Sequence, residues 1–245
     1  MQGALLYIGD HVNQYTPGGY PMRGSRTPRR IVKRMKLTKH EHANLVLDKG
    51  NETLVIDPGA FTTPLTDLRN VVGIVITHEH PDHWTPEQLD RILEMNPDAK
   101  IYGPQGVAVA AAAYPVIVVH DGDEIAVGEF ALRFFGEKHA VIHSSFPVID
   151  NVGVIVDGAL AYPGDSFTVP PIEVDVLAVP AGAPWLKIGE VMDYVAEVKP
   201  KRSFPTHEMV LSVIGKNMAN ERIGSVTESN GGKFFALEPG DTLDL

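Results

Sequence analysis

The chain contains no cysteine among its 245 residues. A disulfide framework, a thiolate metal site and a cysteine nucleophile are therefore excluded, and any metal ion must be held by histidine, aspartate or glutamate. No apolar run reaches the roughly 18–20 residues of a membrane-spanning helix. No cationic segment precedes the short apolar stretch near the start, as a secretory signal would require. We expect a cytoplasmic protein without a membrane partner.

Basic residues are scarce and unevenly placed. The chain has 31 acidic and 21 basic residues, a formal net charge of −10. Six of the bases and one of the acids fall within residues 1–34, so residues 35–245 carry −15. A body this acidic repels phosphate backbones, which disfavours nucleic acid as a partner. Residues 1–34, rich in Pro, Gly, Ser and Arg, are predicted to be a disordered basic tail, or to precede a true start at Met35.

Strand and helix patterns alternate from Met35 onward. The strands are predicted over 44–47, 53–56, 71–77, 100–102, 116–119, 130–135, 152–156, 160–162, 174–179, 203–206 and 234–237. The helices are predicted over 86–95, 107–113, 188–198 and 208–222, the first with Thr85 as N-cap and Pro86 at its first position. Hairpins mixed with strand–helix units indicate one α/β domain with mixed sheets over residues 35–245.

Three of the ten histidines fall within the six residues 78–83, His-Glu-His-Pro-Asp-His. This cluster directly follows the predicted strand 71–77, and open α/β sheets bind ligands beyond the carboxyl ends of their strands. Neutral imidazoles placed this closely need partners, and charged ones would repel one another. A bound divalent cation removes both problems, so we favour a metal site over a structural turn.

Further candidate ligands follow other predicted strands. His139 comes after strand 130–135, Asp165 after strand 160–162, and His207 after strand 203–206. Each alone would more often be a cap or a turn residue. Together with the cluster, and in this order, they indicate one metal centre.

These motifs resemble the metallo-β-lactamase superfamily over residues 35–245. The matching segments are residues 54–59 (Leu-Val-Ile-Asp-Pro-Gly), residues 77–83, His139, Gly164 with Asp165, and His207. Residues 35–43 are similar to the start of the small cytoplasmic subgroup related to L-ascorbate-6-phosphate lactonase. The resemblance implies a four-layer αββα sandwich with a dinuclear metal site on one edge.

The resemblance also implies a role for each matching residue. One metal ion would be held by His78, His80 and His139, the other by Asp82, His83 and His207, with Asp165 bridging them. Asp57 would accept the second ring proton of a ligand histidine. His143 is the alternative third ligand or a pocket residue; we prefer His139 because it directly follows a strand. His42 would be either a pocket residue or a structural histidine.

Two neighbouring cations lower the pKa of a bridging water, supply a hydroxide and polarise a carbonyl or phosphoryl oxygen, so no serine nucleophile is needed. We expect Asp82 and Asp165 to be the catalytic carboxylates. The nitrogen and oxygen donors suit Zn²⁺, with Mn²⁺ or Fe²⁺ as alternatives. Trp185 and Lys187 follow strand 174–179, beyond its carboxyl end, and are candidate pocket residues. Lys187 is a candidate to hold an anionic group; the alternative is a solvated lysine beside a packed tryptophan.

The sequence therefore predicts a hydrolase that acts on a small, anionic lactone, ester, thioester or phosphoester. A phosphodiesterase or nuclease of the same fold is one alternative, and the charge of −15 on residues 35–245 argues against it. A non-catalytic metal-binding protein is the other, although such a protein would not need a complete ligand set. The oligomeric state is left open.

Overall fold

The computed structural model describes residues 34–245, and apart from Arg34 the predicted basic tail lies outside the described residues. The first sheet contains β1 (Met35–Lys39), β2 (Leu45–Lys49), β3 (Glu52–Ile56), β4 (Val71–Val75), β5 (Lys100–Gly103), β6 (Val116–Val118) and β14 (Thr242–Asp244), in the order β14-β1-β2-β3-β4-β5-β6. The second contains β7 (Glu124–Val127), β8 (Phe130–Phe135), β9 (Gly153–Val156), β10 (Leu160–Tyr162), β11 (Val176–Pro180), β12 (Arg202–Thr206) and β13 (Lys233–Phe234), in the order β13-β12-β11-β10-β9-β8-β7.

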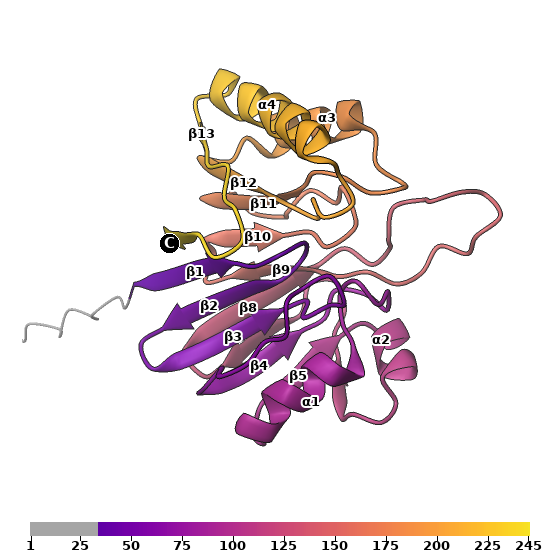
Figure 1. Ribbon diagram of the computed structural model, residues 1–245, viewed down its shortest axis with the longest axis vertical. Coiled ribbons are helices and arrows are strands. Elements are labelled where there is room, and N and C mark those ends of the chain that lie inside the picture. Colours follow the sequence, from indigo (N-terminus) through magenta and orange to yellow (C-terminus); the bar gives the residue numbers. More distant parts are fainter. Residues whose placement is uncertain (1–33) are drawn as a thin grey trace, which may run out of the picture. The chain divides into compact units, whose positions relative to one another are not determined.

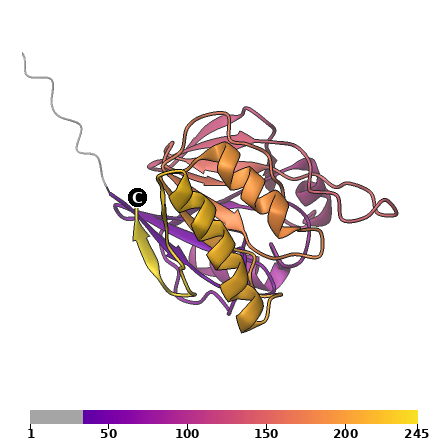
Figure 2. The ribbon, with the colours of Figure 1, turned by 90° about the horizontal axis from the view of Figure 1, so that it is seen from above.

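In the described residues 34–245, four helices cover the outer faces of the two sheets (Figure 1). The first sheet packs against α1 (Pro86–Met95) and α2 (Gln105–Ala110), and the second against α3 (Ile188–Val198) and α4 (Val213–Ser229). Seen from above, α3 and α4 lie side by side over their sheet (Figure 2). Among residues 34–245, no helix combines the length and the apolarity needed to cross a membrane.

Each sheet is antiparallel on one side and parallel on the other. In the first sheet the pairs from β1 to β3 are antiparallel and those from β3 to β6 are parallel. In the second sheet the pairs from β7 to β10 are antiparallel and those from β10 to β13 are parallel. The predicted four-layer αββα sandwich with mixed sheets is confirmed.

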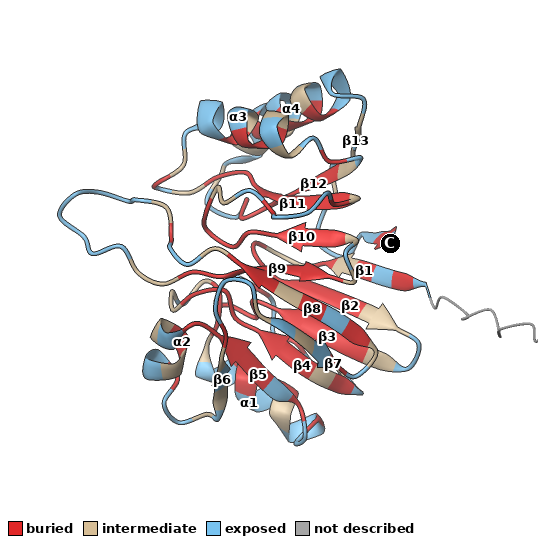
Figure 3. Ribbon diagram, turned by 180° about the vertical axis from the view of Figure 1, so that it is seen from behind, coloured by how far each residue is buried: buried red, intermediate tan, exposed pale blue. Residues whose placement is uncertain are grey.

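Three clusters of buried apolar side chains hold the layers together. Buried residues run along most strands of both sheets (Figure 3). The central cluster joins the inner faces of the sheets and includes Leu54 and Ile56 of β3. Val55, between them, belongs to the cluster under α1 and α2, and a third cluster lies under α3 and α4. Successive residues of a strand point to opposite faces, so a strand covered on both sides must be apolar throughout. This requirement explains the continuous apolar runs of β3, β4 and β11.

The predicted helix boundaries are right for α1 and α3 and wrong for α4. Thr85 caps α1, and its side chain accepts a hydrogen bond from the Gln88 N–H. The helix predicted over residues 208–222 instead begins at Val213, capped by Ser212, and ends at Ser229. His207 has a φ of 60°, and the Glu208 side chain forms a buried ion pair with Lys39, so the chain cannot enter the helix directly after β12.

The strand predictions miss three strands at or near the sheet edges. β1 alternates apolar with polar residues, β7 is a short strand that begins with Glu124, and β14 contains a single apolar residue, Leu243, so none of them has the long apolar run of a central strand. The strand predicted over residues 71–77 ends at Val75. The next two residues stay bonded to the sheet, since the Ile76 N–H donates to the Tyr102 carbonyl and the Thr77 N–H donates to Asp57.

Gly59 places the loop after β3 directly against the backbone of residues 78–83. A Cβ atom on Gly59 would lie 1.8 Å from the Asp82 carbonyl oxygen. We expect Gly59→Ala to lower the free energy of unfolding by about 3 kcal/mol or more, because backbone cannot yield as a side chain can. Urea unfolding of the chelator-treated protein measures this loss.

Gly189 in α3 provides the matched control, since a Cβ there meets nothing within 4 Å. Gly189→Ala should leave stability unchanged or raise it by up to about 1 kcal/mol, the helix preference of alanine over glycine. Equal stabilities for the two variants would show that the contact between the two loops does not constrain the fold.

Candidate metal centre

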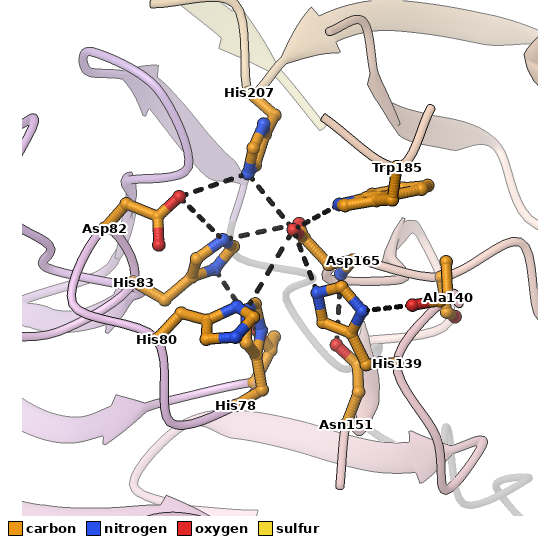
Figure 4. Close-up of polar contacts among 12 residues, drawn as sticks. His78, His80, Asp82, His83, His139, Ala140, Asn151, Asp165, Trp185 and His207 are labelled. Carbon is orange, nitrogen blue, oxygen red and sulfur yellow. Dashed lines mark hydrogen bonds and ion pairs between the residues drawn. The ribbon is translucent and has the colours of Figure 1, made fainter. Parts of the chain in front are cut away.

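The ends of four strands bring the seven predicted ligand residues together at one edge of the sandwich (Figure 4). Residues 78–83 follow β4, while His139, Asp165 and His207 follow β8, β10 and β12. The described residues contain three overlapping groups whose ligand atoms lie within 4.8 Å of one another. These are His78, His80 and His139; His78, His83 and Asp165; and His42, Asp82, His83 and His207.

Three imidazoles are oriented by hydrogen bonds that their Nδ1 atoms donate. Each Nδ1 faces an oxygen acceptor, which fixes a proton there and leaves Nε2 to face the shared centre. The Nδ1–oxygen distances are 2.7 Å for His83 to Asp57 Oδ2, 2.5 Å for His139 to the Ala140 carbonyl, and 2.6 Å for His207 to the Gly182 carbonyl. The three Nε2 atoms are buried and have no hydrogen-bond partner.

Asp57 and Thr77 orient the base of the cluster. The Thr77 hydroxyl donates its proton to Asp57 Oδ2 at 2.7 Å, so its oxygen is left to accept from His78 Nδ1 at 3.1 Å. His78 Nε2 then lies 3.0 Å from His80 Nδ1. Burial, and after it the nearby His83, lowers the pKa of His78 well below its usual value. His78 is therefore neutral and able to act as a ligand.

Asp165 lies at the middle of the cluster. Its Oδ2 atom is 3.1 Å from His207 Nε2 and 3.4 Å from His139 Nε2, and its Oδ1 atom is 3.3 Å from His83 Nε2. The indole N–H of Trp185 donates to Oδ2 at 2.9 Å. The backbone N–H of Asp165 donates to Asn151 Oδ1 at 3.0 Å, which fixes the position of the carboxylate.

The buried carboxylates and imidazoles shift one another's pKa values. Burial by itself would raise the pKa of Asp165, but His207 and His83 outweigh it and hold that pKa well below its usual range. Burial would lower the pKa of His207, yet Asp165 raises it to about 9. Asp165 and Asp57 likewise raise the pKa of His83 despite its burial. Protons on the His83 and His207 rings balance the negative charge of Asp165, and a bound cation would displace these protons.

The residues present fit a metal ion. The Nε2 atoms of His83, His139 and His207 and the Oδ1 atom of Asp165 are all buried without a hydrogen-bond partner. Buried polar atoms of this kind are costly unless another group satisfies them. Imidazole nitrogens and carboxylate oxygens in this number match the donors that Zn²⁺ and related divalent ions take.

His42 is oriented differently from the other histidines of the cluster. The Met209 N–H donates to its Nδ1 at 3.4 Å, so Nε2 carries the ring proton and donates to Asp82 Oδ2 at 3.1 Å. Burial lowers the pKa of His42 to about 4, which keeps the ring neutral. The side chain of His42 therefore holds Asp82 in place instead of offering a lone pair to the centre.

Two predicted pocket residues lie away from the cluster. His143 is exposed in the loop between β8 and β9, where its Nδ1 faces Ser145 Oγ at 2.7 Å. Lys187 is the N-cap residue of α3, with 82 % of its side chain exposed and its Nζ 3.2 Å from Glu190. Neither side chain belongs to the cluster, and a contact of either with a substrate stays a prediction from the sequence.

Asn151 and Thr77 are parts of the site to which the sequence assigned no role. Thr77 begins the motif at residues 77–83, but nothing in the sequence shows which side chains Thr77 and Asn151 contact. The contact of Asn151 with Asp165 depends on the pairing of β9 with β10, and that of Thr77 with Asp57 on the pairing of β3 with β4. Trp185 is a predicted pocket residue, and its bond to Asp165 likewise requires the folded chain.

Comparisons with known proteins identify the family. A family model described as a beta-lactamase superfamily domain matches residues 36–207. Protein Rv0786c of Mycobacterium tuberculosis is 37 % identical over 201 residues, covering 80 % of this chain and 94 % of that protein. The UPF0173 metal-dependent hydrolase SSO0099 of Saccharolobus solfataricus is 26 % identical over 228 residues, covering 83 % of this chain and 96 % of that protein.

Solved structures share the fold. Igni18, a metallo hydrolase from Ignicoccus hospitalis, superposes with a TM-score of 0.65 at 18 % identity, covering 86 % of this chain and 98 % of that one. The layered sheets and the histidine–aspartate centre define a metallohydrolase. The chain belongs to the metallo-β-lactamase superfamily and is a metal-dependent hydrolase of that superfamily.

The two candidates for the third ligand can be separated by metal binding. We expect His139→Ala to weaken the binding of Zn²⁺ about a hundredfold or more, since even residues that only support a ligand change affinity 10- to 100-fold. His143→Ala should bind Zn²⁺ like the unaltered protein, because His143 lies outside the cluster. Competition with a chromophoric chelator measures both affinities, and a stronger effect at His143 would reverse the assignment.

Proposed function

We propose that the centre holds two divalent ions. His78, His80 and His139 would hold one, and Asp82, His83 and His207 the other. Asp165 would bridge them, because its two oxygens face histidines of both groups. The all-nitrogen and oxygen donor set favours Zn²⁺, with Mn²⁺ or Fe²⁺ as alternatives.

Ions bound at such a centre lower the pKa of water toward neutrality and polarise a carbonyl or phosphoryl oxygen. Asp165 and Asp82 have different roles in this proposal, because their side chains are exposed to different degrees. Asp165 has 3 % of its side chain exposed and is held by Trp185, so it keeps the ligands at a constant separation. Asp82 has 21 % exposed and is anchored through Oδ2 by His42, which suits it to orient an incoming water molecule.

We propose hydrolysis of a small molecule with an ester-type carbonyl or a phosphoryl group. The centre itself supports this proposal, since it contains donors for metal ions and a partly exposed carboxylate. The anionic substrate, the lactonase-type specificity and the cytoplasmic location stay predictions from the sequence. Lys187 gives no support to an anionic substrate, because its side chain extends into solvent.

Replacement of Asp165 tests the proposed function. The protein, purified without chelator and loaded with Zn²⁺, should contain about two ions per chain and hydrolyse at least one compound in a panel of lactones, esters, thioesters and phosphodiesters. Asp165→Asn should lower kcat/KM about a thousandfold, the equivalent of about 4 kcal/mol of transition-state stabilisation by the metal pair.

Asp150→Asn is the control, because Asp150 is a carboxylate outside the cluster that pairs with Lys138. This variant should keep full activity and full metal content. Turnover of phosphodiesters alone would favour the phosphodiesterase alternative. A full metal content without turnover on any compound would favour a non-catalytic metal-binding protein.

A further inference from the structure

Lys39 is the only lysine or arginine among residues 34–245 whose side chain is buried. It is the last residue of β1, and its Nζ atom lies 2.6 Å from Oε1 of Glu208, which follows β12 by two residues. The two side chains are 0 % and 2 % exposed. Because β1 and β12 belong to different sheets, this ion pair joins the two sheets at the edge that carries the metal centre.

The ion pair is a poor means of stabilising the fold. Two charges lose their hydration when they are buried, and apolar side chains of similar size often stabilise a protein as well or better. Within the described part of the chain, Glu208 Oε2 is also buried without a hydrogen-bond partner, so the carboxylate is only half satisfied. A pair that gains so little stability is better suited to fixing where the neighbouring residues lie.

Two histidines beside the ion pair have an unusual backbone conformation. His42, three residues after Lys39, and His207, directly before Glu208, both have a φ of 60°. This left-handed conformation is uncommon for residues other than glycine, and it persists where the surrounding contacts impose it. The His207 N–H donates to the His42 carbonyl at 2.9 Å, and the two ring centroids are 3.9 Å apart. The ion pair therefore closes the two loops around the contact between these histidines.

His207 carries this contact into the metal centre. Its backbone N–H is held by His42, and its Nδ1 faces the Gly182 carbonyl at 2.6 Å. Its Nε2 lies 3.4 Å from Asp82 Oδ2 and 3.1 Å from Asp165 Oδ2 (Figure 4). With the ring fixed at Nδ1, the position of Nε2 depends on where the backbone of residues 207 and 208 lies.

We infer that the ion pair of Lys39 and Glu208 is a positioning device for His207. It holds the backbone of His207 against His42 and so places Nε2 where a metal ion can bind to it. The inference rests on the proposed function, which makes His207 a metal ligand. Neither Lys39 nor Glu208 belongs to the groups that could hold a metal ion, so the pair acts on metal affinity through His207.

Replacement of both charges tests the inference. Lys39→Met combined with Glu208→Leu fills the same space with apolar side chains, so the chelator-treated protein should unfold at the same or a higher urea concentration. The Kd measured is that of the Zn²⁺ ion whose binding His207→Ala weakens, by competition with a chromophoric chelator on the full chain. The double replacement should raise this Kd about ten- to hundredfold, as the loss of a group that supports a ligand does.

The control replaces the ion pair of Lys49 and Asp157, whose charged atoms are 2.7 Å apart. This pair also joins the two sheets, but it lies at the turns after β2 and β9, on the edge opposite the metal centre. Lys49→Met combined with Asp157→Asn should leave the Kd for Zn²⁺ unchanged. An equal rise of Kd in this control would overturn the inference, since any link between the sheets would then have the same effect.

A double-mutant cycle with His207→Ala separates positioning from a general structural effect. Without the His207 ring, a shift of the backbone moves no Nε2 atom, so replacement of Lys39 and Glu208 should now change Kd less than threefold. Equal effects with and without the His207 ring would overturn the inference, as would an unchanged Kd when the ring is present.

Glu208→Asp takes the place of the double replacement if that variant does not fold. It keeps both charges and shortens one side chain by a methylene, and the same dependence on His207 is expected. One ion per chain, or no turnover on any compound, would overturn the proposed function alone, because the cycle measures the coupling to His207 in either case. A protein that binds no Zn²⁺ would overturn both.

Discussion

The buried contact between the Asp165 carboxylate and the surrounding imidazoles is the constraint on which the rest of the site depends. Charges and unpartnered polar atoms inside a protein are costly unless another charge or a ligand compensates them. Here Asp165 faces three Nε2 atoms, and those three histidines are held from behind by Asp57, Ala140 and Gly182. The three rings cannot turn away from Asp165 without breaking their hydrogen bonds to Asp57, Ala140 and Gly182. A bound cation is therefore the natural partner for their Nε2 atoms.

The mixed sheets explain why such a centre forms at this place. Strands that run in the same direction end at the same edge, and β8, β10 and β12 each deliver one ligand-bearing segment there. The first sheet supplies residues 78–83 after β4, and the Val152 N–H donates to the Thr77 carbonyl across the two sheets. The apolar core between the sheets thus sets the distance between the two halves of the ligand set.

The surroundings of the centre contain more exposed apolar side chains than the net charge of the chain suggests. The acidic composition disfavours polyanionic partners, and the lysines on the neighbouring segments are paired or directed into solvent. Apolar side chains occupy several of the exposed positions beside His42 and along the loop after His139.

The sequence by itself determined the layered α/β class, the order of the ligand segments and the superfamily. Those properties depend on local signals: apolar periodicity, the Thr85 cap and six consecutive residues with three histidines. Only the tertiary structure decided that His139 and not His143 enters the cluster, that Trp185 and Asn151 hold Asp165, and that α4 begins at Val213. Each of these outcomes depends on contacts between residues distant in the chain, such as Lys39 with Glu208, which strand pairing brings together and local pattern does not encode.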